Sequence, residues 1–344
     1  MKQNPSKYSI LKRSPKESAL MNLVQKTTGS NSKVLTLSDY CETEDTNSFK
    51  VITDALVNPE YGFTSFSMVY SAIPYEGAEH IATAITHPNN NVETLNFSNT
   101  NIAVVDAFVL AQAFTHPNSK VVFLNLANGF MGVYSMQSIA TALVHPNCKV
   151  SYLNLSHSLV GQKGAEHLAA ALANQNCRLV YLNLDERSSF TGRNGYSEIT
   201  ESLKSNFYLL YLSNVNTTQA AAYIKRNQEQ FTSNCRLVLD GGNLSEADRV
   251  MVLTQCQTLM QIDPVIQGIS KEEMQTVVGK LRELGVNPLL RSIPSAQLQN
   301  HLAAAAPISL TEADKPSVTY DAEPSWQQQT GQAKTEGTEV LQVS

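Results

Sequence analysis

The chain has 344 residues, of which 42% are hydrophobic and 16% are charged, and its formal net charge is −5. This composition is typical of a soluble globular protein: no apolar run reaches the ~18 residues of a membrane span, and the acidic balance argues against nucleic acid as a partner. The five cysteines are odd in number, form no C-x-x-C pair and follow no apolar signal segment, so we expect a reduced, cytoplasmic protein.

Residues 1–30 form a basic N-terminal segment that carries one helix signal. Ser14-Pro15-Lys16-Glu17 combines a capping box with proline at the first helical position. The pattern predicts a helix from about residue 15 to about residue 27, which ends near Gly29 and covers the exposed side of the first repeat.

A repeat with a period of 29 residues occupies the region 31–244. Its clearest copies are "VETLNF" (92–97), "VVFLNL" (121–126), "VSYLNL" (150–155) and "LVYLNL" (179–184), aligned on Leu95, Leu124, Leu153 and Leu182. The series extends backwards to Leu35 and Phe66 and forwards to Leu210 and Leu237, which gives about eight units. The less regular intervals at both ends are typical of capping repeats.

A second pattern follows each of these runs and indicates a helix. Apolar residues recur four positions apart with alanines between them, as in "GAEHLAAAL" (164–172), so one helix face is apolar. The L-x-L runs alternate with a period of two and predict short strands. Each unit is therefore strand, turn, helix and loop, and only stacked neighbours can bury its apolar face, with the strands forming a parallel sheet.

The unit "HPNCKVSYLNLSHSLVGQKGAEHLAAAL" (145–172) resembles a leucine-rich repeat of the ribonuclease-inhibitor type. The resemblance implies an α/β leucine-rich repeat solenoid, or horseshoe, with parallel strands on the concave face and helices on the convex face. The family usually places asparagine or cysteine at the turn after the strand. This chain instead has Thr100, Gly129, Ser158 and Arg187 there, so we expect the hydroxyls of Thr100 and Ser158 to satisfy the buried turn.

Three histidines recur at the repeat interval in "THPN", "THPN" and "VHPN", namely His87, His116 and His145. Each follows the last apolar position of a predicted helix and precedes a proline, which cannot continue that helix. Asn58 and Asn174 hold the same slot in flanking units. Helices in such a stack lie ~8–10 Å apart, so three histidines cannot converge on one metal. We interpret them as helix stops and predict no metal site.

The period fails after Asn243, and residues 245–308 are predicted to form a small helical domain or C-terminal cap. Ser245 and Ser270 can each cap a helix, the second ahead of "MQTVVGKLRELG" (274–285), and a third helix is expected over 296–306. Residues 309–344 are rich in Glu, Thr, Gln, Ser and Pro, which predicts a disordered polar tail.

The candidate site is the concave strand face, because alternate strand residues point away from the core and form columns across units in register. One column is aromatic in three units and is expected to expose its rings as partner-binding anchors; it contains Thr94, Phe123, Tyr152 and Tyr181. The second column contains Asn96, Asn125, Asn154 and Asn183, and Tyr211 is assigned to it. Its stacked amides can bond one another, so the column either only stiffens the sheet or also contacts the partner. The adjoining loop 185–195 is a second contact candidate through Asp185, Arg187 and Arg193.

Enzyme signatures such as G-x-G-x-x-G, G-x-x-x-x-G-K-[ST], H-E-x-x-H and G-x-S-x-G are missing. Cys148, Cys177 and Cys235 precede the repeat strands and are interpreted as small buried residues, and Cys256 as a core residue. We therefore predict a monomeric, non-catalytic scaffold without a cofactor, which binds a partner protein and neither nucleic acid nor membrane.

Two further hypotheses come from resemblance. Leucine-rich repeats also occur in an activator of the GTPase Ran and in bacterial ubiquitin ligases, where the repeats select the substrate. A ligase of that kind needs a reactive cysteine, and only Cys256 lies in the helical region. The chain is also similar to leucine-rich-repeat effectors that intracellular bacterial pathogens inject into host cells, which implies a host protein as partner in the host cytosol. The tail 320–344 is then the expected secretion signal.

Overall fold

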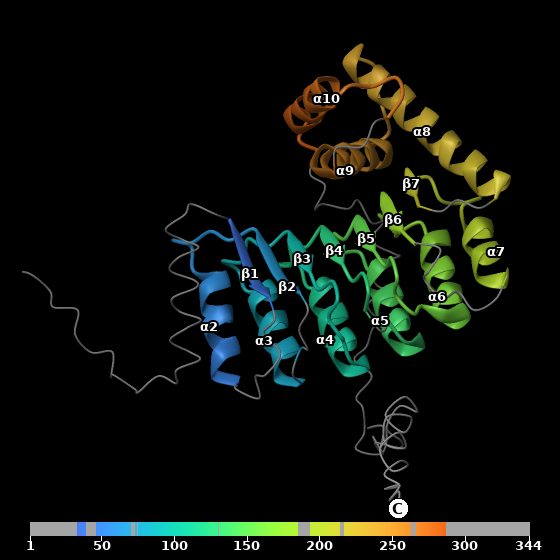
Figure 1. Ribbon diagram of the computed structural model, residues 1–344. Helices are drawn as coiled ribbons and strands as arrows, with labels where there is room; N and C mark the ends of the chain where they lie inside the picture. The colour runs from blue at the N-terminus through green and yellow to red at the C-terminus, as the bar shows by residue number, and fades with distance from the viewer. Residues whose placement is uncertain are drawn as a thin grey trace, which may run out of the picture. The chain divides into compact units, whose positions relative to one another are not determined.

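A computed structural model of the chain describes residues 33–38, 46–69, 73, 75–129, 131–184, 193–213, 217–262 and 266–286. These residues belong to one compact unit, which contains a parallel seven-stranded sheet in the order β1 to β7 (Figure 1). The strands are β1 (Val34–Ser38), β2 (Ser65–Val69), β3 (Thr94–Asn96), β4 (Phe123–Asn125), β5 (Tyr152–Asn154), β6 (Tyr181–Asn183) and β7 (Tyr211–Leu212). The expected helices over 15–27 and 296–306 and the tail lie outside the described residues.

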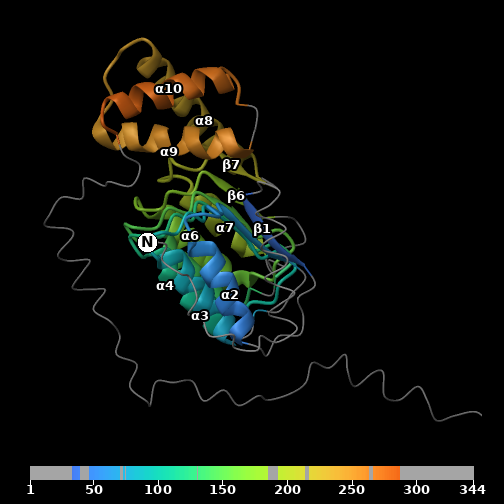
Figure 2. The same ribbon diagram turned by 90° about the vertical axis from the view of Figure 1, so that its left-hand side faces the viewer.

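Six helices alternate with the strands and form a layer on one side of the sheet, as both views show (Figures 1 and 2). They are α2 (Thr46–Val57), α3 (Tyr75–Thr86), α4 (Val104–Phe114), α5 (Val133–Leu143), α6 (Gly161–Ala173) and α7 (Arg193–Ser202). We number each repeat unit by its strand. The open parallel sheet with helices on one face confirms the expected leucine-rich-repeat-like solenoid.

The strand register matches the 29-residue period, because Leu95 pairs with Leu124, Leu124 with Leu153 and Leu153 with Leu182. These leucines are at most 1% exposed and lie in a continuous core with the apolar faces of the helices. Burial of a leucine side chain is worth roughly 1.5–3 kcal/mol, and no single unit can provide that burial alone. The packing of each unit's leucine against the equivalent leucine of the next unit therefore holds the units together.

The turn after two of the strands is fixed by a buried hydroxyl, as the sequence predicts. The Thr100 hydroxyl donates to the Met68 carbonyl at 2.8 Å, and the Ser158 hydroxyl donates to the Leu126 carbonyl at 2.8 Å. Each bond joins a turn to the preceding unit. At Gly129, an added Cβ would lie 3.1 Å from the Leu126 oxygen and 3.2 Å from the Thr100 oxygen, so that turn leaves little room for a side chain.

The three HPN histidines close the turns that follow α3, α4 and α5. In each, the histidine Nδ1 accepts the backbone N–H of the asparagine two residues later, at 3.1 Å for His87 and 3.2 Å for His116 and His145. Asn58 and Asn174 accept the equivalent N–H through Oδ1, at 2.9 and 2.8 Å. Histidine thus replaces the carbonyl of an Asx turn, which supports the interpretation of the motif as a helix stop.

The prediction of an eighth strand around Leu237 is wrong. Leu237 and Cys235 lie instead in α8 (Thr218–Leu239), a helix of 22 residues that begins at the N-cap Thr217, whose side chain accepts the Ala220 N–H. Buried residues of α8 recur at helical spacing, as in Ile224, Asn227, Phe231 and Cys235. This periodicity overrides the short "RLVLD" run, so the strand series ends at β7.

Two more helices follow, α9 (Glu246–Ile262) and α10 (Lys271–Glu283). Both begin where predicted: the Ser245 hydroxyl accepts the Asp248 N–H at 3.1 Å, and Ser270 forms a capping box with Glu273. With α8 they enclose a second apolar core, which also takes in Val180 and Leu210 from the repeats. None of the helices in the described part of the chain is long and apolar enough to cross a membrane.

Removal of the Ser158 hydroxyl should destabilise the solenoid. The substitution Ser158→Ala leaves the Leu126 carbonyl without this donor, and we expect the free energy of unfolding to fall by about 1–3 kcal/mol in urea titration. Ser138→Ala is the control, because that hydroxyl bonds within α5 to the Tyr134 carbonyl at the helix surface and its loss should cost under about 0.5 kcal/mol. Equal losses would contradict the assigned role.

The histidine slot should accept asparagine but not alanine. His116→Asn keeps an acceptor for the Asn118 N–H, whereas His116→Ala removes it and should cost about 0.5–1.5 kcal/mol of unfolding free energy. Urea unfolding with and without zinc separates this role from metal binding. A metal role predicts that zinc stabilises the wild type and that His116→Asn abolishes the effect.

Candidate functional site

The aromatic column of the concave face forms a continuous stack of rings. We use "concave face" for the side of the sheet opposite α2–α7. Phe123 and Tyr152 have ring centroids 5.3 Å apart, Tyr152 and Tyr181 lie stacked at 4.6 Å, and Tyr181 and Tyr211 lie stacked at 5.9 Å. The strand register produces this stack, because the residues that carry neighbouring rings are paired across adjacent strands. Thr94, half-buried, pairs with Phe123 and begins the column.

Two expectations about this column need correction. Tyr211 does not continue the asparagine column, because it pairs with Tyr181 and stacks on its ring; the one-residue longer spacing from Tyr181 shifts the alignment. Phe123 is only 8% exposed and so is not an exposed anchor, its ring packing against Tyr152. The remaining anchors are the half-buried Tyr152, Tyr181 and Tyr211.

The hydroxyls of Tyr152 and Tyr211 stay protonated at neutral pH. Burial, and the neighbouring Tyr181, raise the pKa of Tyr152 and of Tyr211 above its ordinary value. A phenol that keeps its proton can donate a hydrogen bond as well as accept one. The column therefore offers flat apolar rings with a polar hydroxyl on each, the combination that is enriched at protein interfaces.

The asparagine column stiffens the strand ends and leaves donors available. The Oδ1 atoms of Asn96, Asn125 and Asn154 accept the backbone N–H two residues later at 3.0, 3.1 and 3.0 Å, and Asn183 accepts the Ser213 hydroxyl at 2.5 Å. Among the described residues no hydrogen bond joins one of these amides to the next, and Asn96, Asn125 and Asn154 instead form Asx turns. The half-buried Nδ2 groups of Asn96, Asn125 and Asn154 remain without a partner there.

The loop candidates contribute no described side chain. Asp185 and Arg187 lie outside the described residues, as does the side chain of Arg193, although its backbone begins α7. The site thus rests on the two columns that the strands themselves carry.

Helix α9 lies on the concave side of the sheet, as Figures 1 and 2 both show. Ser151, which precedes β5, is hydrogen-bonded to Thr258 of α9 at 2.6 Å, and both residues are buried. Gln255 of the same helix donates to the Phe207 and Tyr208 carbonyls at 3.2 and 3.1 Å. The C-terminal helices therefore cover the edge of the concave face at which β5–β7 begin, and α9 forms a wall along one side of the candidate site. The sequence did not reveal this placement.

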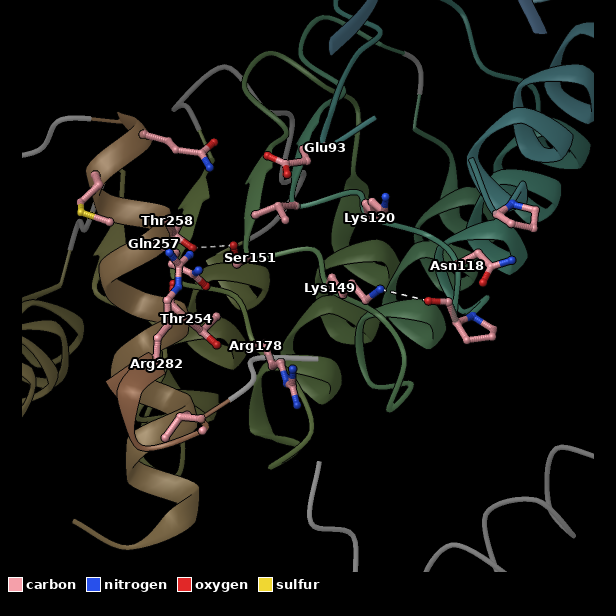
Figure 3. A pocket seen from close by; sticks show the side chains of 17 residues that line it. Glu93, Asn118, Lys120, Lys149, Ser151, Arg178, Thr254, Gln257, Thr258 and Arg282 are labelled. Atoms are coloured by element: carbon pink, nitrogen blue, oxygen red, sulfur yellow. Dashed lines mark hydrogen bonds between the residues drawn. The ribbon is translucent and has the colours of Figure 1, made fainter. Parts of the chain in front are cut away.

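A pocket that sequence reasoning missed lies between α9, α10 and the loops that lead into the strands (Figure 3). Its lining includes four cations, Lys120, Lys149, Arg178 and Arg282. The first three are spaced by 29 residues, and this spacing is the signal that could have found them.

The cysteines lie in apolar surroundings. Cys148, Cys177, Cys235 and Cys256 are buried, as expected. The Sγ atoms of Cys235 and Cys256 are 3.9 Å apart. This contact, together with burial, raises the pKa of the Cys256 thiol well above its ordinary value. No group of three His, Cys, Asp or Glu side chains among the described residues is arranged to hold a metal ion.

The Ser151–Thr258 bond gives a test of how α9 is attached. Thr258 donates to the Thr254 carbonyl at 2.9 Å, which leaves Ser151 as the donor to Thr258. We expect Thr258→Val to cost about 1–3 kcal/mol of unfolding free energy, because it orphans a buried hydroxyl, and Ser151→Ala to cost less. The double variant should be less destabilised than the sum of the two. Strict additivity in urea titrations would show that the two hydroxyls are not coupled.

Comparison with known proteins adds little to this geometry. No family model matches the chain, and no curated protein matches it. Among solved structures, the chain is similar to "Leiomodin-1 Actin-Binding Site 2 (ABS2)", with 22% identity and a TM-score of 0.39 over 44% of this chain and 88% of that chain. At this identity and TM-score, the functional argument rests on the strand face itself.

Proposed function

We propose that the chain is a non-catalytic scaffold that binds a partner protein on the concave face of its repeats, which we take to be of the ribonuclease-inhibitor type. The observation that carries the proposal is the stack of Tyr152, Tyr181 and Tyr211, half-buried on a rigid sheet. Interface energy is usually concentrated in a few tyrosine, tryptophan or arginine residues that lose their water on binding.

The stack is suited to binding because it is already ordered. Immobilising a flexible side chain at an interface costs roughly 0.5–1.5 kcal/mol, and rings held against one another across paired strands have lost that freedom before a partner arrives. The Nδ2 groups of Asn96, Asn125 and Asn154 run beside the stack and can donate to carbonyl or carboxylate oxygens of the partner. The wall formed by α9 limits the direction from which a partner reaches β5–β7.

The alternatives receive less support. A ubiquitin-ligase mechanism needs a nucleophilic thiolate, and Cys256 is buried with a raised pKa. Activation of a GTPase stays a prediction, which GTP hydrolysis assays with and without this protein would test. The effector hypothesis, with a host protein as partner, also stays a prediction, since residues 320–344 lie outside the described part of the chain.

Replacement of the central rings should abolish partner binding. The partner is first isolated by affinity capture and then purified. We expect the double substitution Tyr152→Ala with Tyr181→Ala to raise its dissociation constant at least ~30-fold, which corresponds to a loss of about 2 kcal/mol of binding free energy. Titration calorimetry measures the constant, and far-ultraviolet circular dichroism checks the fold. Tyr152→Phe with Tyr181→Phe keeps the rings and should retain most of the affinity.

Tyr134→Ala is the matched control, because Tyr134 is the most exposed of the large apolar side chains described (67%) but lies on α5, in the helix layer. It should bind as the wild type does. A partner that is lost with Tyr134→Ala and kept by the strand-face variant would place the interface on the helices and refute the concave-face proposal.

A further inference from the structure

The pocket between the repeats and the C-terminal helices, which we call the basic pocket, has an unbalanced charge. Its volume is about 850 Å³, and its lining contains four cations, Lys120, Lys149, Arg178 and Arg282. Glu93 is the single carboxylate among the 17 side chains that line it (Figure 3). The chain as a whole carries a formal charge of −5, so this concentration of positive charge is local.

Three of the cations form a column that the strand register creates. Lys120, Lys149 and Arg178 each lie three residues before a strand residue of the aromatic column, and those residues pair with one another. Adjacent strands are ~4.7–4.9 Å apart, so three like charges are held in succession. The same slot holds Asn31, Gly62 and Asn91 in the first three units. The fold therefore does not require a cation there.

The two lysines of the column are held in place by uncharged acceptors. The Lys149 ammonium donates to the Pro117 and Ser119 carbonyls at 3.0 and 2.5 Å, and the Lys120 ammonium donates to Asn91 Oδ1 at 2.9 Å. None of the carboxylate–cation pairs between described residues includes Lys120, Lys149 or Arg282. These contacts orient the two lysine side chains and leave the positive charge of Lys120 and Lys149 uncompensated.

The charges are also partly removed from water. Burial, and then repulsion from Lys120 and Arg178, lower the pKa of Lys149, and burial lowers the pKa of Arg178, which is only 6% exposed. Like charges in a partly desolvated site destabilise the folded state unless an opposite charge joins them. Arg282 of α10 adds a further cation to the lining, and Thr254 and Gln257 of α9 add neutral hydrogen-bonding groups.

We infer that the basic pocket binds a small molecule that carries several phosphate groups. Guanidinium groups bind phosphate oxygens in a bidentate manner, and ammonium groups bind them as point charges. The volume falls in the range of small-molecule sites, roughly 300–1,000 Å³, and is too small for a folded partner. A cluster of phosphates matches a column of cations better than a single carboxylate, which could neutralise only one of them.

Two sources carry this chemistry, a soluble phosphorylated metabolite and the headgroup of a phosphoinositide lipid. The probes for the first are inorganic tripolyphosphate and inositol 1,4,5-trisphosphate. The probe for the second is a phosphatidylcholine vesicle with about 5% phosphatidylinositol 4,5-bisphosphate, compared with phosphatidylcholine alone. Binding to either class supports the phosphate site, and the class that binds more tightly identifies the source.

The experiment uses the full chain in titration calorimetry and thermal unfolding, with vesicle flotation for the lipid arm. We expect the bound probe to raise Tm, and Lys149→Gln and Arg282→Gln each to weaken its binding at least tenfold. Arg282 lies on α10, away from the turns that Lys149 holds, so it tests the pocket even where Lys149→Gln unfolds the loop. Lys163→Gln is the control for the loss of one positive charge, because Lys163 is an exposed residue of α6 paired with Glu166.

Three results would overturn the inference. The first is failure of every phosphorylated probe to bind the wild-type chain. The second is an equal loss of affinity in Lys163→Gln, which would mean attraction by net charge alone. The third is unchanged affinity in both Lys149→Gln and Arg282→Gln with circular dichroism spectra like that of the wild type, which would place the bound anion elsewhere.

Discussion

Parallel pairing of neighbouring strands in a fixed register is the interaction on which the rest of the structure depends. Because each unit repeats after 29 residues from β3 to β6, a residue lies beside its own counterpart in the next unit. Leucines therefore pack against leucines and aromatic rings against aromatic rings, and cations lie beside cations. The leucine column contributes stability directly, since it removes apolar surface from water in every unit at once.

The same register acts differently on polar columns. Asparagines placed side by side could bond to one another, but the Oδ1 atoms of Asn96, Asn125 and Asn154 each close a turn within their own unit, where the geometry is local. Buried hydroxyls do the reverse: Thr100 and Ser158 reach back to the preceding unit. Cations are the unfavourable case, because the register holds like charges side by side and an anion bound beside them would relieve the repulsion.

The sequence predicts the periodic part of this structure well, because periodicity is a local property that survives in every copy. The strands around Leu95 to Leu182, the hydroxyl turns and the caps at Ser245 and Ser270 all follow from spacing and residue type. Two predictions failed where the period ends. Leu237 fits a strand column by count, but the helical spacing from Ile224 to Cys235 prevails. Tyr211 fell into the wrong column because its unit is one residue longer.

What no local pattern could reveal is the placement of the C-terminal helices. Ser151 and Thr258 are 107 residues apart in sequence, and no pattern in either segment predicts their contact. That contact decides which part of the concave face stays open, and it creates the basic pocket. Tyr152 lies three positions after Lys149 in the sequence, and Ser151 between them is hydrogen-bonded to Thr258 of α9. The proposed protein-binding face and the basic pocket thus meet at α9. A helix that appears in the sequence only as a C-terminal cap becomes the boundary between the two surfaces.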